Sequence, residues 1–81
     1  MFKVGVVTHY YPKIGVAIIE LDNALAVNDR VKFTFGKDDL FEQKVESIQV
    51  GHKKLESAGR GETIGVKTSQ EVPEGTEIFK L

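Results

Sequence analysis

Cysteine and tryptophan are both absent from this sequence, and proline occurs only twice. Without cysteine the chain forms no disulfide and offers no thiolate ligand to a metal, which fits a reducing compartment, so we expect the cytoplasm. The N-terminus shows no basic segment followed by a long apolar run, and no stretch is apolar for long enough to make a transmembrane helix. We therefore expect a soluble chain with neither a signal peptide nor a membrane partner.

A strong excess of charge of either sign is also missing. Eleven basic and twelve acidic side chains give a formal net charge of −1, whereas a dedicated duplex-binding domain usually carries a clear basic excess. Any contact with nucleic acid is therefore expected to be local. With 81 residues, 41% of them hydrophobic, the chain is long enough for one core and too short for two, which predicts a single domain over residues 1–81.

The side chains that carry catalytic or metal chemistry are few and are not grouped. His9 and His52 are the only histidines, and without cysteine or suitably spaced carboxylates they predict no zinc site. No serine lies in a nucleophile elbow, and the adjacent carboxylates of Asp38 and Asp39 are expected to point apart. A phosphate-binding loop of the Walker type is absent, so no nucleotide is expected. The sequence predicts no enzyme, no cofactor and no metal.

Apolar and polar residues alternate along several short segments, which is the period-two pattern of β-strands. No segment shows the apolar stripe of a helix. Short strands separated by turn residues predict an all-β fold, and closure is attractive because it hides unpaired strand edges. We expect a small six-stranded antiparallel closed β-barrel of the translation-protein type, with strands at residues 2–9, 14–21, 30–35, 40–50, 62–67 and 76–81.

Some of these segments carry more detailed expectations. Val31, Phe33 and Phe35 fall on one face of the strand at 30–35. Along 40–50 the apolar face switches partway, which is typical of a bulge. Asn28 is the candidate for a positive φ angle, because asparagine tolerates the left-handed region better than other residues with a side chain. The polar segment 51–61 is expected to be a loop with one short extended piece.

The side chains most suited to binding form a local basic run within one strand–loop–strand region. Together with two tyrosines available for stacking, this run predicts a face for single-stranded or structured RNA. The alternative, a solvated surface on which Glu46, Glu56 and Glu62 offset the basic charges, stays open. The candidate binding residues are Lys44, His52, Lys53, Lys54, Arg60, Lys67, Tyr10 and Tyr11.

The chain resembles the second domain of translational GTPases such as elongation factor Tu over nearly its whole length. The resemblance rests on Leu25, Val27, Asp29 and Val31 and on three later stretches, residues 45–49, 52–54 and 58–66. It implies a six-stranded antiparallel barrel. Asn28 stands where that family usually has glycine, and the turn is expected to survive the difference.

Residues 5–17 are more similar to the C-terminal barrel of collagenase-like peptidases, the family numbered thirty-two among the U-type peptidases. Here the barrel is expected as a free-standing small protein, so neither GTPase nor peptidase activity transfers to it. The sequence predicts a non-catalytic module that docks on transfer or ribosomal RNA or on a translation or RNA-modification complex. The alternative is a protein-interaction or homo-oligomerisation module like the peptidases' accessory domain. The identity of the partner stays open.

Overall fold

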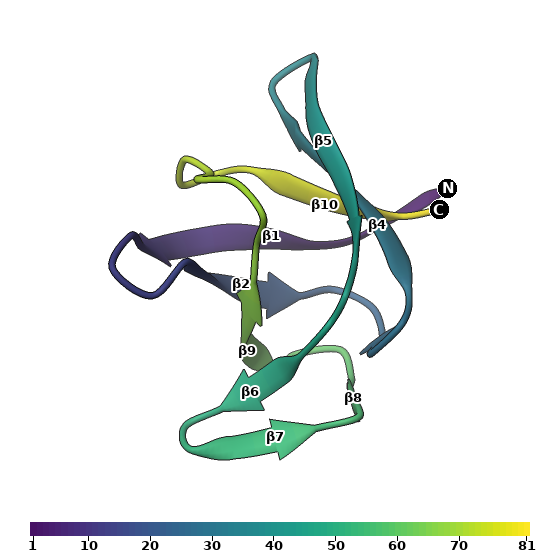
Figure 1. Cartoon of the computed structure of the whole chain (residues 1–81). Coiled ribbons are helices and arrows are strands. Elements are labelled where there is room, and N and C mark those ends of the chain that lie inside the picture. Colours follow the sequence, from purple (N-terminus) through teal and green to yellow (C-terminus); the bar gives the residue numbers. More distant parts are fainter.

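Ten strands and no helix make up the structure, a computed structural model that describes all residues from 1 to 81 (Figure 1). No helix is therefore present that has the length and apolarity to cross a membrane. The strands are β1 (Phe2–Tyr11), β2 (Val16–Leu21), β3 (Leu25–Ala26), β4 (Arg30–Phe35), β5 (Asp38–Lys44), β6 (Ile48–Val50), β7 (Lys53–Leu55), β8 (Ser57–Ala58), β9 (Thr63–Lys67) and β10 (Glu77–Lys80).

Eight strands form one curled sheet in the order β5-β4-β10-β1-β2-β9-β6-β7, and β3 and β8 pair separately. Every pair is antiparallel, so the all-β antiparallel fold predicted from the period-two pattern is confirmed. β1 lies at the centre of the larger sheet, between β10 and β2 (Figure 1). Phe2 pairs with Lys80, which places the two ends of the chain side by side.

The larger sheet curls, but the six-stranded closed barrel predicted from the sequence is not confirmed. Its two ends are β5 and β7, and no ladder joins them. Where β5 approaches the end of β9, the Gln43 side chain makes the hydrogen bonds that a neighbouring strand makes elsewhere. Its Nε2 donates to Lys67 O at 2.8 Å, and its Oε1 accepts from Ser69 N at 2.8 Å. One side-chain amide thus bridges a gap that backbone pairing leaves open.

The inner face of the curled sheet encloses one apolar core. Its members come from almost every strand, so the strands of both sheets share the same apolar cluster. Tyr10, Val27, Phe41 and Leu55 pack against it from the margin. The fifteen buried residues are Val4, Val7, Ala17, Ile19, Leu21, Leu25, Val31, Phe33, Val45, Ile48, Ala58, Ile64, Val66, Val72 and Ile78.

The sequence pattern predicts regular alternation along residues 2–9, but β1 does not alternate regularly. Its register shifts between Lys3 and Gly5 against β10 and between Val7 and His9 against β2. Each bulge adds one residue and so exchanges the two faces of the strand. The core side of β1 therefore runs through Val4, Val7 and the half-buried Tyr10.

The strand expected at 30–35 is confirmed as β4, and Val31 and Phe33 are buried. Phe35, expected on the same face, is 44% exposed. The register shift between β4 and β5 adds Leu40 to β5 and no residue to β4, because Phe33 pairs with Phe41 and Thr34 with Asp39. Phe35 is the last residue of β4. The alternation along a strand predicts which side chains share a face, but it does not show where along the strand the core ends.

The segment expected as one bulged strand at 40–50 consists of two strands with different neighbours. β5 pairs with β4, and β6 pairs with β7 and β9. The switch of apolar face marks a corner of the chain, where Val45 is buried and its N–H donates to Asp29 O. Nearby, Asn28 has the expected positive φ, 79°. The expected loop at 51–61 contains β7 and β8.

Gly5 lies where β1 comes closest to β2. A Cβ atom at this position would stand 2.6 Å from the Glu20 carbonyl oxygen and 2.8 Å from Cγ2 of Ile19. Real Cβ atoms do not approach other atoms this closely, and the carbonyl belongs to the backbone of β2. A side chain at residue 5 would therefore push two central strands apart, so the sheet needs glycine here.

We expect Gly5→Ala to lower the free energy of unfolding by about 1–3 kcal/mol, because the added methyl group overpacks a rigid ladder. Gly59→Ala is the matched control, since no atom lies within 4 Å of its Cβ position, and we expect it to change stability by less than about 0.5 kcal/mol. Urea unfolding of both variants measures the difference. Equal stability of the two variants would show that the strands separate more easily than the contact implies.

Candidate functional site

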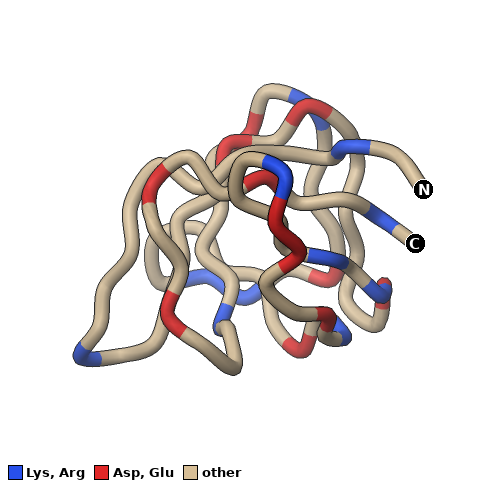
Figure 2. The backbone as a smooth tube through the Cα atoms, turned by 90° about the horizontal axis from the view of Figure 1, so that it is seen from above, with Lys and Arg blue, Asp and Glu red and all other residues tan.

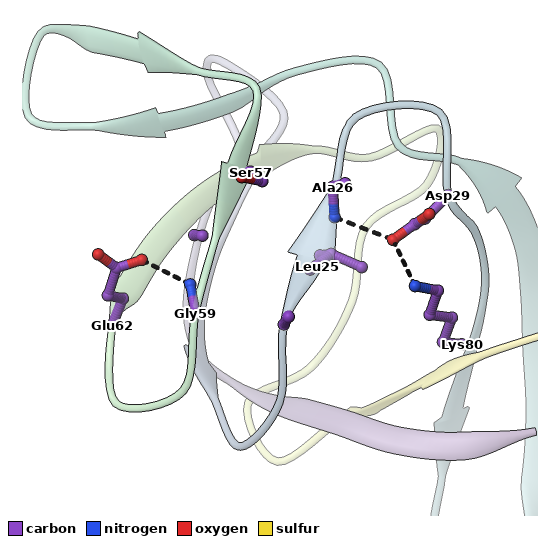
Figure 3. A pocket seen from close by; sticks show the side chains of 9 residues that line it. Leu25, Ala26, Asp29, Ser57, Gly59, Glu62 and Lys80 are labelled. Atoms are coloured by element: carbon purple, nitrogen blue, oxygen red, sulfur yellow. Dashed lines mark hydrogen bonds and ion pairs between the residues drawn. The ribbon is translucent and has the colours of Figure 1, made fainter.

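A shallow hollow of about 400 Å³ lies beside the small sheet of β3 and β8 (Figure 3). Leu25 and Ala26 come from β3, Ser57 and Ala58 from β8, and Lys80 from the end of β10. The residues of the hollow thus come from three separate parts of the chain, 24–29, 57–62 and residue 80. Ala24, Asp29, Gly59 and Glu62 complete the lining.

Asp29 holds the turn between β3 and β4 at the edge of this hollow (Figure 3). Its Oδ2 accepts a hydrogen bond from Ala26 N at 2.9 Å and pairs with Lys80 Nζ at 3.1 Å. Its backbone oxygen accepts from Val45 N at 2.8 Å. The Asp29 side chain is 20% exposed, so these contacts are partly shielded from water. Asp29 therefore joins the small sheet to β10 and to the corner after β5.

The remaining polar groups of the hollow also serve the local backbone. Glu62 Oε2 accepts from Gly59 N at 2.7 Å and so closes the turn between β8 and β9. Ser57 carries the only hydroxyl group of the lining, and no histidine lines the hollow. The Ser57 hydroxyl therefore has no histidine beside it in the lining to act as its general base. Elsewhere in the chain, no three His, Asp or Glu side chains are grouped so that they could hold a metal ion.

The structure distributes the predicted basic run over three places. Lys44 ends β5 and Lys67 ends β9, and both line a cleft of about 280 Å³ with Gln43, Glu46, Thr68 and Ser69. His52 lies in the turn between β6 and β7, and Lys53 and Lys54 follow in β7. Arg60 lies in a different turn, between β8 and β9. The six residues therefore do not form one compact cluster.

None of these six basic residues forms an ion pair. The three glutamates expected to offset them, Glu46, Glu56 and Glu62, form no ion pair either. Over the whole chain, however, basic and acidic residues are interspersed (Figure 2). The run thus consists of unpaired cations on a surface of mixed charge.

The two tyrosines at the end of β1 face opposite sides of the sheet. Tyr10 pairs with Ala17 and packs against the core, whereas Tyr11 pairs with Val16 and is 47% exposed. The Tyr11 ring meets the His9 ring edge to face, with centroids 4.4 Å apart. His9 also lies 3.4 Å from the Glu74 carboxylate. Only Tyr11 therefore presents an aromatic ring to the outside at this position.

Comparison with known proteins relates this chain to a part of larger proteases. An uncharacterized protease of Methanocaldococcus jannaschii is 35% identical to it over 79 residues, which are 98% of this chain and 19% of the protease. The chain therefore spans about a fifth of that relative. No model of a known protein family matches the chain.

Two solved structures share the fold. The C-terminal domain of a candidate U32 peptidase of Geobacillus thermoleovorans superposes with a TM-score of 0.91, covering 99% of this chain and 92% of that domain at 22% identity. The selenomethionine variant of the same domain gives a TM-score of 0.86 and covers 96% of each chain, also at 22% identity. The predicted likeness to the C-terminal barrel of collagenase-like peptidases is therefore shown for the fold. The likeness to elongation factor Tu stays a prediction from sequence.

We expect Asp29→Ala to lower the free energy of unfolding by about 1.5–3 kcal/mol, because it removes a charged acceptor from Ala26 N–H and leaves Lys80 unpaired. Asp29→Asn keeps an acceptor and loses only the ion pair, so we expect it to cost less than about 1 kcal/mol. Thermal and urea unfolding measure both. If the alanine variant were as stable as the wild type, Asp29 would not hold the turn.

Proposed function

We propose that this chain is a non-catalytic docking module, the counterpart of the C-terminal domain of U32 peptidases, and that it binds a peptidase catalytic region. The observation that carries the proposal is the extent of the sequence match, because nearly the whole chain corresponds to only 19% of a protease. A segment of this size is one building block of that protein. The likeness in fold to a peptidase C-terminal domain supports the same role.

The polar groups of the chain support a binding role rather than a chemical one. The carboxylates of the hollow beside β3 and β8, Asp29 and Glu62, accept hydrogen bonds from backbone N–H groups, and its lysine pairs with Asp29. These groups are occupied in maintaining the fold. What the chain presents to a partner is the outside of the curled sheet.

The test uses the M. jannaschii protease from which the matching 79-residue segment has been deleted. We expect this chain to bind the folded deletion variant and to leave the intact protease, which has its own segment, largely unbound. Sedimentation velocity measures the complex, and circular dichroism checks that the deletion variant is folded. If the deletion variant is folded and does not bind the chain, the docking role is refuted. Cleavage of peptide substrates by the chain alone would refute the non-catalytic role.

RNA is the second candidate partner, because the six basic residues of the run have no acidic partner. Backbone phosphates attract unpaired lysines, and such binding weakens steeply as salt is added. Filter binding with transfer RNA at low and moderate salt tests whether the chain binds RNA. Salt-sensitive binding that Lys53→Glu and Lys54→Glu abolish would support this candidate, and the absence of binding at low salt would remove it.

A further inference from the structure

The outer side of β2, β9 and β6 carries a row of residues set by the strand register. Ile18 pairs with Gly65, and Gly65 pairs with Gln49. At the two ends of this row, His9 of β1 lies opposite Ile18, and Lys54 of β7 lies opposite Gln49. Residues directly opposite each other in antiparallel strands share a face of the sheet. One continuous outer face therefore extends from β1 to β7.

An apolar groove of about 290 Å³ runs along this face. Val16 and Ile18 form one wall, and a Cβ atom at Gly65 would lie 3.2 Å from Val16 Cγ1 and 3.7 Å from Ile18 Cδ1. Because Gly65 has no side chain, the floor of the groove is the backbone of β9. Ile14 is 60% exposed and Val50 is 43% exposed at the hairpin turns that bound the groove.

Lysines outnumber carboxylates around the groove. Lys13 lies in the turn between β1 and β2, Lys54 shares the face of the groove, and Lys67 pairs with Val16 on the same face. None of the three forms an ion pair. Glu20, two residues after Ile18 and opposite Thr63, is the one carboxylate on this face of β2. The groove is thus apolar along its middle, with more basic than acidic side chains around it.

We propose that this groove binds a polypeptide segment of the partner domain in which apolar side chains are flanked by acidic residues. The inference rests on the docking role proposed above and names its surface. Tyr11 is the one aromatic residue of the lining, and its ring meets the His9 ring edge to face. The other apolar side chains, such as Ile14 and Ile18, are aliphatic and match apolar side chains of a peptide, whereas successive bases of single-stranded RNA need several aromatic platforms for stacking. The lysines around the groove match carboxylates of the same segment and steer its approach.

The first experiment measures binding of two labelled synthetic peptides to the intact chain by fluorescence anisotropy. One peptide has a centre of leucine and valine flanked by glutamates, and the other has the same centre flanked by lysines. We expect the glutamate peptide to bind at least about tenfold more tightly, with a preference that shrinks as salt is added. Equal affinity for the two peptides, or no binding of either, would overturn the proposal.

Substitutions then test whether the glutamate peptide binds in the groove. Ile14→Ser and Val50→Ser are each expected to weaken glutamate-peptide binding about tenfold, because each removes an exposed apolar side chain that lines the groove. Phe35→Ser is the matched control, since Phe35 is 44% exposed on the β4–β5 hairpin, outside the groove. Lys54→Glu is compared in the same way with Lys37→Glu, another unpaired lysine. If the controls weaken binding as much as the groove variants, the groove is not the site.

The deletion variant of the protease separates failure of the groove from failure of the docking role. If the wild-type chain binds it and Ile14→Ser and Val50→Ser bind equally well, the groove is overturned and the docking role stands. If the wild-type chain does not bind it, the docking role fails, and the peptide measurements still decide whether the groove takes an acidic, apolar segment. Tighter binding of transfer RNA or of anionic vesicles than of the glutamate peptide, through the same residues, would also overturn the proposal.

Discussion

The bulge at Thr8 is the constraint on which the arrangement of this molecule depends. It lies in the central strand, where Val7 still pairs with Ile19 but His9 pairs with Ile18, so the two faces of β1 exchange at this point. Tyr10 consequently packs against the core, and Tyr11 lies outside. Without the added residue, Tyr10 would be directed to solvent, and Tyr11, which lines the outer groove, would turn away from it.

The close contact at Gly5 constrains the other half of the strand. It allows β1 to lie against β2 while it also pairs with β10, and the eight-stranded sheet curls around fifteen buried apolar residues. The curl is incomplete, and Gln43 bridges the gap beside β9 with one side-chain amide. The fold therefore relies on backbone pairing at its centre and on a side chain near its edge.

Period-two patterning predicts the fold class and the position of most strands, and the turn chemistry of asparagine predicts the positive φ of Asn28. It does not predict the register shifts, because a bulge depends on the partner strand as well as on the strand itself. The same limit applies to the candidate site. The sequence predicts a basic run with Tyr10 and Tyr11 available for stacking, but Tyr10 packs against the core. The groove is formed by β2, β6 and β9, and only the register brings Gly65 beside Ile18 and Gln49.

The outer face of β2, β9 and β6 is the surface on which we propose that this module meets its partner. The most direct test measures the change in backbone amide chemical shifts of the isotope-labelled chain as the glutamate-flanked peptide is added. We expect changes that concentrate in β2, β6, β9 and the turns at Lys13 and His52. Changes confined to the hollow around Asp29, or to the β4–β5 hairpin, would contradict this proposal.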